Sequence, residues 1–326
     1  MKTQIVYTLI SSEKDYFLEE LWVSLYSFRQ FHPEATVNVL VDEPTKKYME
    51  RFPELCGMIT NIVVVPVPEN YNAKQRSRVI KTTVRNVIDG AYLFVDTDTV
   101  ICKPLDDIDS LTCDMAAVPD GHLPLSECMF PPTNSVNKIF KTDVSDSKYW
   151  FNSGVMFVAD NEQTRKFYKR WNENWTYSCF EKGQSQDQPA LLATDKEFGY
   201  IISELPGIYN AQVAMSLKYF ADAAIVHWWH MSFIENQDYS PFFSLQIYKD
   251  VKKFKGLSDE TIEQIEHCKQ SFVSPSMPVG KEHIYFLFSP AGKIFNRIYK
   301  EGGAACFLMN KCASILEKIH KYTKKK

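Results

Sequence analysis

The chain has 326 residues, 45% of them hydrophobic and 24% charged, which is ordinary for a globular protein with a large buried core. That length suits one big domain or two modest ones. A net charge of −3 excludes the strongly basic balance of many nucleic-acid-binding proteins, so we expect no nucleic-acid partner. The charge is uneven, however, because residues 281–326 carry ten Lys or Arg against three Glu.

The cysteines and the amino-terminal segment indicate the compartment. The eight cysteines form no C-x-x-C pair and no metal-ligand spacing with histidine, which is typical of buried, reduced thiols. The first apolar run is only as long as a strand and is followed at once by charges, unlike a secretory signal. No stretch reaches the roughly 20 apolar residues that span a bilayer. We therefore expect a cytoplasmic protein, soluble or at most peripheral on the cytoplasmic face of the membrane.

Short β-rich runs alternate with helical patterns over the first 230 residues. The runs predict strands at Gln4–Ile10, Val37–Val41, Ile62–Val67 and Tyr92–Val95. Apolar residues at helical spacing predict helices between them, over residues 17–28, Pro44–Phe52 and Gln75–Ile88. Such alternation is typical of an α/β fold with a mostly parallel central sheet and helices on both faces. Sheets of this kind bind ligands beyond the carboxyl ends of their strands.

The character of the sequence changes after Trp229. A short acidic helix is predicted at Ser258–Lys269, and Ser271–Gly280 reads as a Ser/Pro-rich connector. The stretches beyond it are aromatic and basic, and the last one has apolar residues at helical spacing. We therefore predict a catalytic domain over residues 1–235 and a helical extension over residues 236–326. The basic, aromatic part of the extension, residues 281–326, is a candidate for peripheral contact with a membrane.

The strongest chemical pattern is the strand Tyr92–Val95, which runs directly into Asp96-Thr97-Asp98. Residues i and i+2 of an extended chain point to the same side, so both carboxylates can face one ion at the edge of the sheet. Mg²⁺ and Mn²⁺ prefer such oxygen ligands and keep positions open for substrate phosphates. The alternative is an acidic turn after a strand, which is common.

The same residues also match the D-x-D-x-V motif of haloacid-dehalogenase-type phosphatases, in which the first Asp is the nucleophile. That motif normally follows the first strand of its domain, whereas here three predicted strands come before it. We find no convincing match to the later Lys and acidic pair that such phosphatases need. The phosphatase is therefore kept as the alternative function.

Three later motifs favour a different family. Phe151–Val158 reads F-N-S-G-V-M-F-V, with a small polar tripeptide ahead of a buried strand, and Gln186-Asp187-Gln188 follows it. A last short strand then ends in His227 and Trp228. In this order, with the D-x-D motif before them, these motifs resemble glycosyltransferase family 8, the retaining enzymes related to glycogenin and bacterial lipopolysaccharide galactosyltransferases. The resemblance extends from Gln4 to about Trp229.

The resemblance implies a GT-A fold, a UDP-sugar donor and Mn²⁺ or Mg²⁺ as cofactor. It implies that Asp96, Asp98 and His227 hold the metal and that Asp96, Thr97 and Asp98 contact the donor. Other residues that it places at the donor are Thr8 and Leu9 beside the uracil and Arg78 or Lys81 as the approaching cation. The residues that it assigns to the sugar and to catalysis are Asp120, Asn152, Asp187 and Gln188.

One departure concerns the diphosphate. The family's H-x-x-G-x-x-K-P-W motif is here His227-Trp-Trp-His230-Met-Ser-Phe233, and the lysine is missing. His230, Arg78 and Lys81 are its candidate substitutes. The prediction is a retaining hexosyltransferase that acts on a saccharide or lipid-linked acceptor. The missing lysine leaves open a catalytically degenerate protein that only binds a nucleotide sugar.

Two motifs have structural interpretations as well. Asn152-Ser153-Gly154 could be simply a turn, because these residue types favour turns. Asp187 could cap the helix that begins beside Pro189, since aspartate is a good amino-terminal cap and proline suits the first turn.

Overall fold

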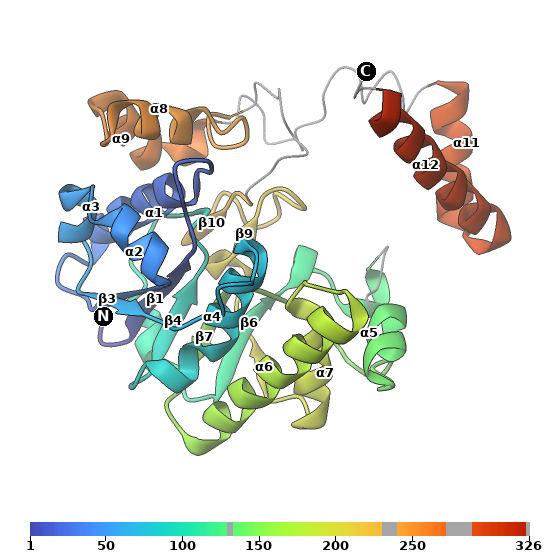
Figure 1. Ribbon diagram of the computed structural model, residues 1–326, viewed down its shortest axis with the longest axis horizontal. Helices are drawn as coiled ribbons and strands as arrows, with labels where there is room; N and C mark the ends of the chain where they lie inside the picture. The colour runs from blue at the N-terminus through green and yellow to red at the C-terminus, as the bar shows by residue number, and fades with distance from the viewer. Residues whose placement is uncertain (129–132, 230–239, 272–288, 324–326) are drawn as a thin grey trace. The chain divides into compact units, whose positions relative to one another are not determined.

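The computed structural model describes residues 1–128, 133–229, 240–271 and 289–323 (Figure 1). The chain divides into two compact units, residues 1–276 and 277–326. The first unit contains a seven-stranded sheet of order β3-β2-β1-β4-β7-β6-β8 and a three-stranded sheet of order β5-β10-β9. The strands are β1 (Gln4–Leu9), β2 (Val37–Val41), β3 (Asn61–Val64), β4 (Tyr92–Val95), β5 (Thr99–Ile101), β6 (Met115–Pro119), β7 (Phe151–Val158), β8 (Ile202–Glu204), β9 (Ala211–Gln212) and β10 (Ile225–His227).

Helices cover both faces of the large sheet, as Figure 1 shows. Successive side chains of a strand point to opposite faces, so β1 contributes to a hydrophobic core on each face. Ile5 and Tyr7 pack in one core together with α1, and Val6 packs in the other together with α4 and α6. The helices of the first unit are α1 (Phe17–Phe31), α2 (Glu43–Met49), α3 (Pro53–Gly57), α4 (Ala73–Val87), α5 (Thr133–Phe140), α6 (Glu162–Lys182), α7 (Gln188–Glu197), α8 (Gln246–Phe254) and α9 (Asp259–Glu266).

The large sheet is mostly parallel, as predicted, with one reversed strand. β1 runs parallel to β2 and β4, β2 runs parallel to β3, and β6 runs parallel to β8. β7 lies antiparallel to both β4 and β6, with Val155 opposite Val95. The first residues of β7 therefore lie at the carboxyl edge of β4, where the Asp96–Asp98 motif begins.

Several predicted elements need correction. The predicted helix Pro44–Phe52 corresponds to α2, which already ends at Met49, and a separate short helix, α3, begins at Pro53. Asn152-Ser153-Gly154 is neither a turn nor a segment ahead of a strand, because it lies inside β7. No disulfide links the eight cysteines, all of which lie in the described part of the chain, but only Cys179 and Cys268 are buried, and Cys312 is exposed.

Helix α8, which follows β10 in the sequence, packs against α1 within the first unit. Ile247 and Val251 of α8 belong to the same hydrophobic core as α1, and Lys252 of α8 pairs with the buried Glu19 of α1 at 3.4 Å. The predicted boundary between a catalytic domain ending at residue 235 and a helical extension starting at residue 236 stays a prediction.

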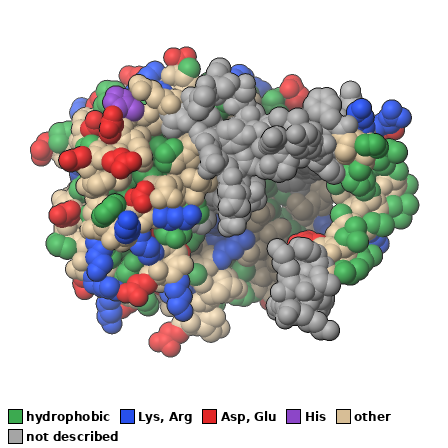
Figure 2. Space-filling view, turned by 90° about the horizontal axis from the view of Figure 1, so that it is seen from above, with side chains coloured by type: hydrophobic (Ala, Val, Ile, Leu, Met, Phe, Trp, Pro, Cys, Tyr) green, Lys and Arg blue, Asp and Glu red, His purple; other side chains and the backbone are tan. Residues whose placement is uncertain are grey.

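The second unit contains α11 (Pro290–Glu301) and α12 (Gly303–Thr323), in agreement with the predicted helical extension. Large apolar side chains on α12 are more than half exposed, including Phe307, Leu316 and Ile319. Figure 2 shows hydrophobic side chains gathered on the surface of this unit. The predicted aromatic stretch at residues 283–288 lies outside the described residues.

Candidate active site

The two aspartates lie where the chain passes from the large sheet to the small one. β4 ends at Val95 and β5 begins at Thr99, so the Asp96–Asp98 motif bridges them. The backbone N–H of Asp96 donates to the carbonyl of Gly154 at 2.7 Å, and the N–H of Trp228 donates to the carbonyl of Asp98 at 2.9 Å. These two bonds fix the motif to β7 on one side and to the end of β10 on the other.

His227 reaches the same place through strand pairing. It ends β10 opposite Thr99 of β5, and its Nε2 lies 3.1 Å from Asp98 Oδ1. One ligand atom from each of Asp96, Asp98 and His227 lies within 4.8 Å of the others. Burial lowers the pKa of His227, but the carboxylates of Asp98 and Asp96 outweigh it, so the pKa is raised.

The surroundings of this cluster suit a divalent cation. Two carboxylates and one imidazole offer the oxygen and nitrogen ligands that Mn²⁺ accepts. A Cβ on Gly154 would lie 2.4 Å from His227 Cε1 and 2.9 Å from Asp96 Oδ2. Only glycine at this position leaves room for the two ligand side chains to converge.

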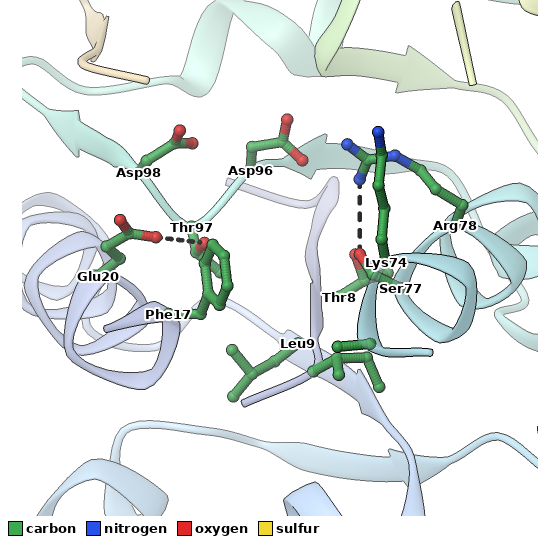
Figure 3. Close-up of a pocket in the computed structure, with 12 residues that line it drawn as sticks. Thr8, Leu9, Phe17, Glu20, Lys74, Ser77, Arg78, Asp96, Thr97 and Asp98 are labelled. Atoms are coloured by element: carbon green, nitrogen blue, oxygen red, sulfur yellow. Dashed lines mark hydrogen bonds between the residues drawn. The ribbon is translucent and has the colours of Figure 1, made fainter. Parts of the chain in front are cut away.

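A cavity of about 530 Å³ opens beside the cluster (Figure 3). Thr8 and Leu9 line it from the end of β1, and Asp96, Thr97 and Asp98 form another wall. The residues that complete the lining come from β1, α1 and α4: Ile10, Phe17, Glu20, Ala73, Lys74, Ser77 and Arg78. The cavity thus brings together the sequence-predicted donor residues, and it adds Phe17, Glu20 and Lys74, which carry no motif in the sequence.

The two candidate cations, Arg78 and Lys81, occupy different places. Arg78 lines the cavity, and its Nε lies 2.8 Å from Asp187 Oδ1; the Asp187 charge raises the pKa of Arg78. Lys81 does not line the cavity. Its Nζ lies 3.0 Å from Asp96 Oδ1, 3.2 Å from Asp96 Oδ2 and 3.8 Å from Asp187 Oδ2. The third candidate, His230, lies outside the described residues.

Of the four predicted sugar-side residues, which we call the sugar-side group, Asp120, Asn152 and Gln188 share hydrogen bonds, whereas Asp187 bonds to Ser153. Asn152 Nδ2 donates to Asp120 Oδ1 at 2.8 Å, and Gln188 Nε2 donates to the same oxygen at 3.3 Å. Ser153 Oγ donates to Asp187 Oδ2 at 2.8 Å. Asp120 comes from the end of β6, Asn152 from β7, and Gln188 from the start of α7.

Asp187 is buried and ionised. Burial raises the pKa of this carboxyl, but Arg78 and Lys81 outweigh burial and lower the pKa to about 2. Its side chain makes no capping hydrogen bond to α7. The capping interpretation of Asp187 is therefore wrong, because its oxygens bind Ser153 and the two cations instead.

A second cavity of about 470 Å³ is lined by Asp120 and shares no lining residue with the first. Its walls include Trp150 and Leu123 as apolar surfaces and the amide side chains of Gln184 and Gln186. A cavity that mixes an indole ring with amides has the composition of a saccharide site. The sequence singled out two of its residues, Asp120 and Gln186, but nothing local joins them to Trp150 and Leu123, so the cavity itself was not predicted.

A mixed, mostly parallel α/β sheet with this aspartate and histidine cluster at its carboxyl edge defines a glycosyltransferase of the GT-A class. The model described as "Glycosyl transferase family 8" matches residues 8–232, and the chain belongs to that family. The resemblance found in the sequence is therefore confirmed, and the phosphatase alternative, which used the same aspartates, is set aside. No curated protein matches the chain in sequence.

Three solved structures are similar to this chain. Mouse xyloside xylosyltransferase 1, in its apo form, is 11% identical, with 70% of this chain and 97% of that one covered and a TM-score of 0.47. The galactosyltransferase LgtC, in complex with donor and acceptor sugar analogs, is 14% identical, with 80% and 100% covered and a TM-score of 0.49. The glycosyltransferase GlyE of Streptococcus pneumoniae TIGR4 is 16% identical, with 84% and 66% covered and a TM-score of 0.49.

No helix in the described part of the chain is both long enough and apolar enough to cross a membrane.

Proposed function

We propose that this glycosyltransferase transfers a hexose from a UDP-sugar to a saccharide or lipid-linked acceptor, with retention of configuration and with Mn²⁺ or Mg²⁺ as cofactor. The observation that carries the proposal is the convergence of Asp96, Asp98 and His227 beside the cavity of about 530 Å³. When bound there, a divalent cation would offset the negative charge that develops on the departing nucleoside diphosphate.

The cavity supports a nucleoside diphosphate as the bound part of the donor. Leu9 and Phe17 supply apolar surface for a flat base, and Thr8 supplies a hydroxyl beside it. Arg78 and Lys74 supply positive charge on the α4 side of the same cavity. A guanidinium binds phosphate oxygens in pairs, so Arg78 is the better substitute for the family's missing lysine than the buried Lys81.

The sugar-side group supports the transfer step. Asp187 is held as a carboxylate by Arg78 and Lys81, so it presents negative charge without being able to act as an acid. An oxocarbenium-like sugar is stabilised by such a charge together with the oriented amides of Asn152 and Gln188. Retention follows from the family resemblance, not from a particular residue.

The second cavity supports a saccharide acceptor. It is lined by Asp120 of the sugar-side group, so an acceptor bound there would lie next to the residues proposed to hold the donor sugar. Trp150 can stack on the apolar face of a sugar ring while Gln184 and Gln186 bind its hydroxyls.

The helical unit supports the lipid-linked alternative among acceptors. It combines the exposed apolar residues of α12 with the basic surplus of residues 281–326. Basic residues bind anionic lipid headgroups, and an apolar helix face inserts among the acyl chains. Peripheral attachment of this kind would keep the enzyme close to an acceptor held in the membrane.

A thermal-shift experiment tests the donor and the metal together. UDP and UDP-sugars should stabilise the protein in the presence of Mn²⁺ and much less with a chelator, by about 2.7 kcal/mol when the ligand is at ~100 times its Kd. Equal stabilisation in both conditions would remove the metal from the proposal. Donor binding without hydrolysis or transfer, tested with a panel of saccharide acceptors, would favour the degenerate, binding-only protein.

A further inference from the structure

Asn210 joins the metal cluster to the sugar-side group, although no sequence motif marks it. It lies just before β9 and is fully buried. Its Oδ1 is 2.9 Å from Nδ1 of His227, and its Nδ2 donates to Oδ1 of Asn152 at 3.0 Å. One amide side chain thus contacts a candidate metal ligand and a candidate sugar ligand at once.

The direction of these hydrogen bonds is fixed from the Asn152 end. The backbone N–H of Gly154 can only donate, and it donates to Asn152 Oδ1 at 2.9 Å. The carboxylate of Asp120 can only accept, and Asn152 Nδ2 donates to it at 2.8 Å. Asn152 therefore cannot turn its amide over without losing both bonds.

The amide orientation of Asn152 determines that of Asn210, which in turn determines which nitrogen of His227 carries hydrogen. Because Asn152 presents an oxygen, Asn210 must turn its NH₂ group toward Asn152 and its carbonyl oxygen toward the imidazole. That oxygen needs an N–H donor, so Nδ1 of His227 carries hydrogen. A neutral imidazole has one N–H, so a hydrogen on Nδ1 leaves the lone pair of Nε2 for a metal ion. Without a metal, the Asp98 carboxylate faces Nε2 and competes for that hydrogen.

We propose that Asn210 is a positioning residue that fixes the tautomer and ring orientation of His227, so that Nε2 is available to a metal ion. Outer partners of metal-bound histidines commonly act in this way. The same amide ties the metal cluster to the sugar-side group through Asn152. The metal part of this inference rests on the proposed function, whereas the tautomer can be tested without any metal.

Two variants separate the two bonds of Asn210. Asn210→Leu has a similar volume and makes neither bond. Asn210→Asp keeps an acceptor for the Nδ1 hydrogen of His227 but can no longer donate to Asn152. Asn38→Leu is the matched control, because Asn38 is also buried and amide-bonded, to Gln4 and Asn61, on the strands β1 to β3 away from the cluster.

The first measurement is the tautomer of His227 by ¹⁵N NMR of the metal-free protein in an Asp98→Ala background, at a pH where its imidazole is neutral. This background removes the carboxylate that competes for a hydrogen on Nε2. There we expect the Nδ1–H form with Asn210 unaltered, in Asn38→Leu and in Asn210→Asp, and its loss in Asn210→Leu. An Nε2–H form with Asn210 unaltered would overturn the proposal, whatever the enzyme transfers.

The second measurement is Mn²⁺ affinity by calorimetry without nucleotide. Asn210→Leu should weaken binding by about 10–100-fold, and Asn210→Asp should bind nearly as well as the unaltered protein. Unchanged affinity in a folded Asn210→Leu variant would overturn the proposal.

If the unaltered protein binds no Mn²⁺, the proposed metal cofactor fails, and the NMR result alone decides the role of Asn210. If Asn210→Leu does not fold, Asn210→Asp still decides: losing the Nδ1–H form there contradicts the proposal.

Discussion

The ammonium group of Lys81 lies between Asp96 and Asp187, 3.0 Å from Asp96 Oδ1 and 3.8 Å from Asp187 Oδ2, in a residue that is only 2% exposed. A lysine this buried is stabilised by the two carboxylates, and they in turn are partly neutralised by it. Lys81 therefore acts as a cation already built into the cluster, beside the position of the proposed metal.

Lys81→Met keeps an apolar side chain of similar length but removes the ammonium group, which lies 4.7 Å from the centre of the Phe94 ring. We expect a loss of about 1–3 kcal/mol in the free energy of unfolding, since Asp187 is buried and Asp96 is only partly so. Because Mn²⁺ would replace part of the lost charge, its stabilising effect should be larger in the variant than in the unaltered protein. Thermal denaturation with Mn²⁺ and with a chelator measures both effects.

Lys74→Met is the control, because Lys74 lines the donor cavity and is exposed. It should weaken UDP binding and change the unfolding free energy little. An equal Mn²⁺ effect in Lys81→Met and in the unaltered protein would show that Lys81 does not share its carboxylates with the metal.

Two further substitutions distinguish the role of the metal cluster in donor binding from the role of the sugar-side group in transfer. Asp98→Asn removes charge from the cluster and should abolish the Mn²⁺-dependent part of UDP binding. Gln188→Ala should leave UDP affinity nearly unchanged and lower kcat by about 10²–10³-fold, because Gln188 binds Asp120 and lies away from the nucleotide cavity. Calorimetry with UDP measures the affinity, and transfer assays measure kcat. A large loss of UDP affinity in Gln188→Ala would contradict this division.

Much of the fold could be predicted because its central strands are continuous apolar runs. The bounds of β2 and β4 are those predicted from Val37–Val41 and Tyr92–Val95. Asn152-Ser153-Gly154 was harder, since these residue types favour turns in isolation. Inside β7 their polar groups are satisfied by Asp120, Asp187 and each other, which no local pattern reveals.

Site residues were likewise predictable where the neighbouring sequence marks them, and not where their place depends on contacts between distant parts of the chain. Asp96 and Asp98 are predictable because a strand runs straight into them, whereas His227 was identified only through the family resemblance. Its place depends on the pairing of β10 with β5 across more than 100 residues of chain. Asn210 has no local pattern, and nothing local joins Asp120 and Gln186 to the other residues of the second cavity, because these relationships arise only from contacts made in the folded protein.

Asp195 gives a prediction about pH and stability. This buried carboxyl accepts a hydrogen bond from the N–H of Ile202 at 3.1 Å, yet burial raises its pKa to about 7. Between about pH 4 and pH 7 the folded chain therefore holds a proton that the unfolded chain has lost. The contribution of Asp195 to the free energy of unfolding consequently falls as the pH rises through this window, and it is constant above it.

Asp195→Asn keeps a neutral acceptor for Ile202 and removes this dependence. At about pH 8 the variant should be more stable than the unaltered protein by at least roughly 1 kcal/mol, and near pH 4 the difference should shrink or reverse, since one pKa unit corresponds to about 1.4 kcal/mol. Thermal denaturation across this range gives the difference between the two proteins, which cancels the other groups that titrate. A difference that does not change with pH would contradict the raised pKa.

The helical unit gives the last prediction, which concerns membrane contact. Leu316 and Ile319 are 65% and 53% exposed on α12, and helical spacing places Asn310 and Ser314 toward a different face. If this apolar face inserts into anionic membranes, replacing Leu316 and Ile319 by Glu should strongly reduce co-sedimentation with phosphatidylglycerol-containing vesicles. The same two negative charges at Asn310 and Ser314 should reduce it less, because only the electrostatic attraction is weakened.

Donor hydrolysis by both variants should match that of the unaltered protein, since the substituted residues lie outside the unit that contains the metal cluster. Equal loss of vesicle binding in the two variants would mean that charge alone attracts the protein and that the apolar face has another use. Absence of vesicle binding by the unaltered protein would remove membrane attachment. Insoluble or unfolded Leu316→Glu/Ile319→Glu protein would instead indicate that the apolar side chains pack within the protein, as core residues do.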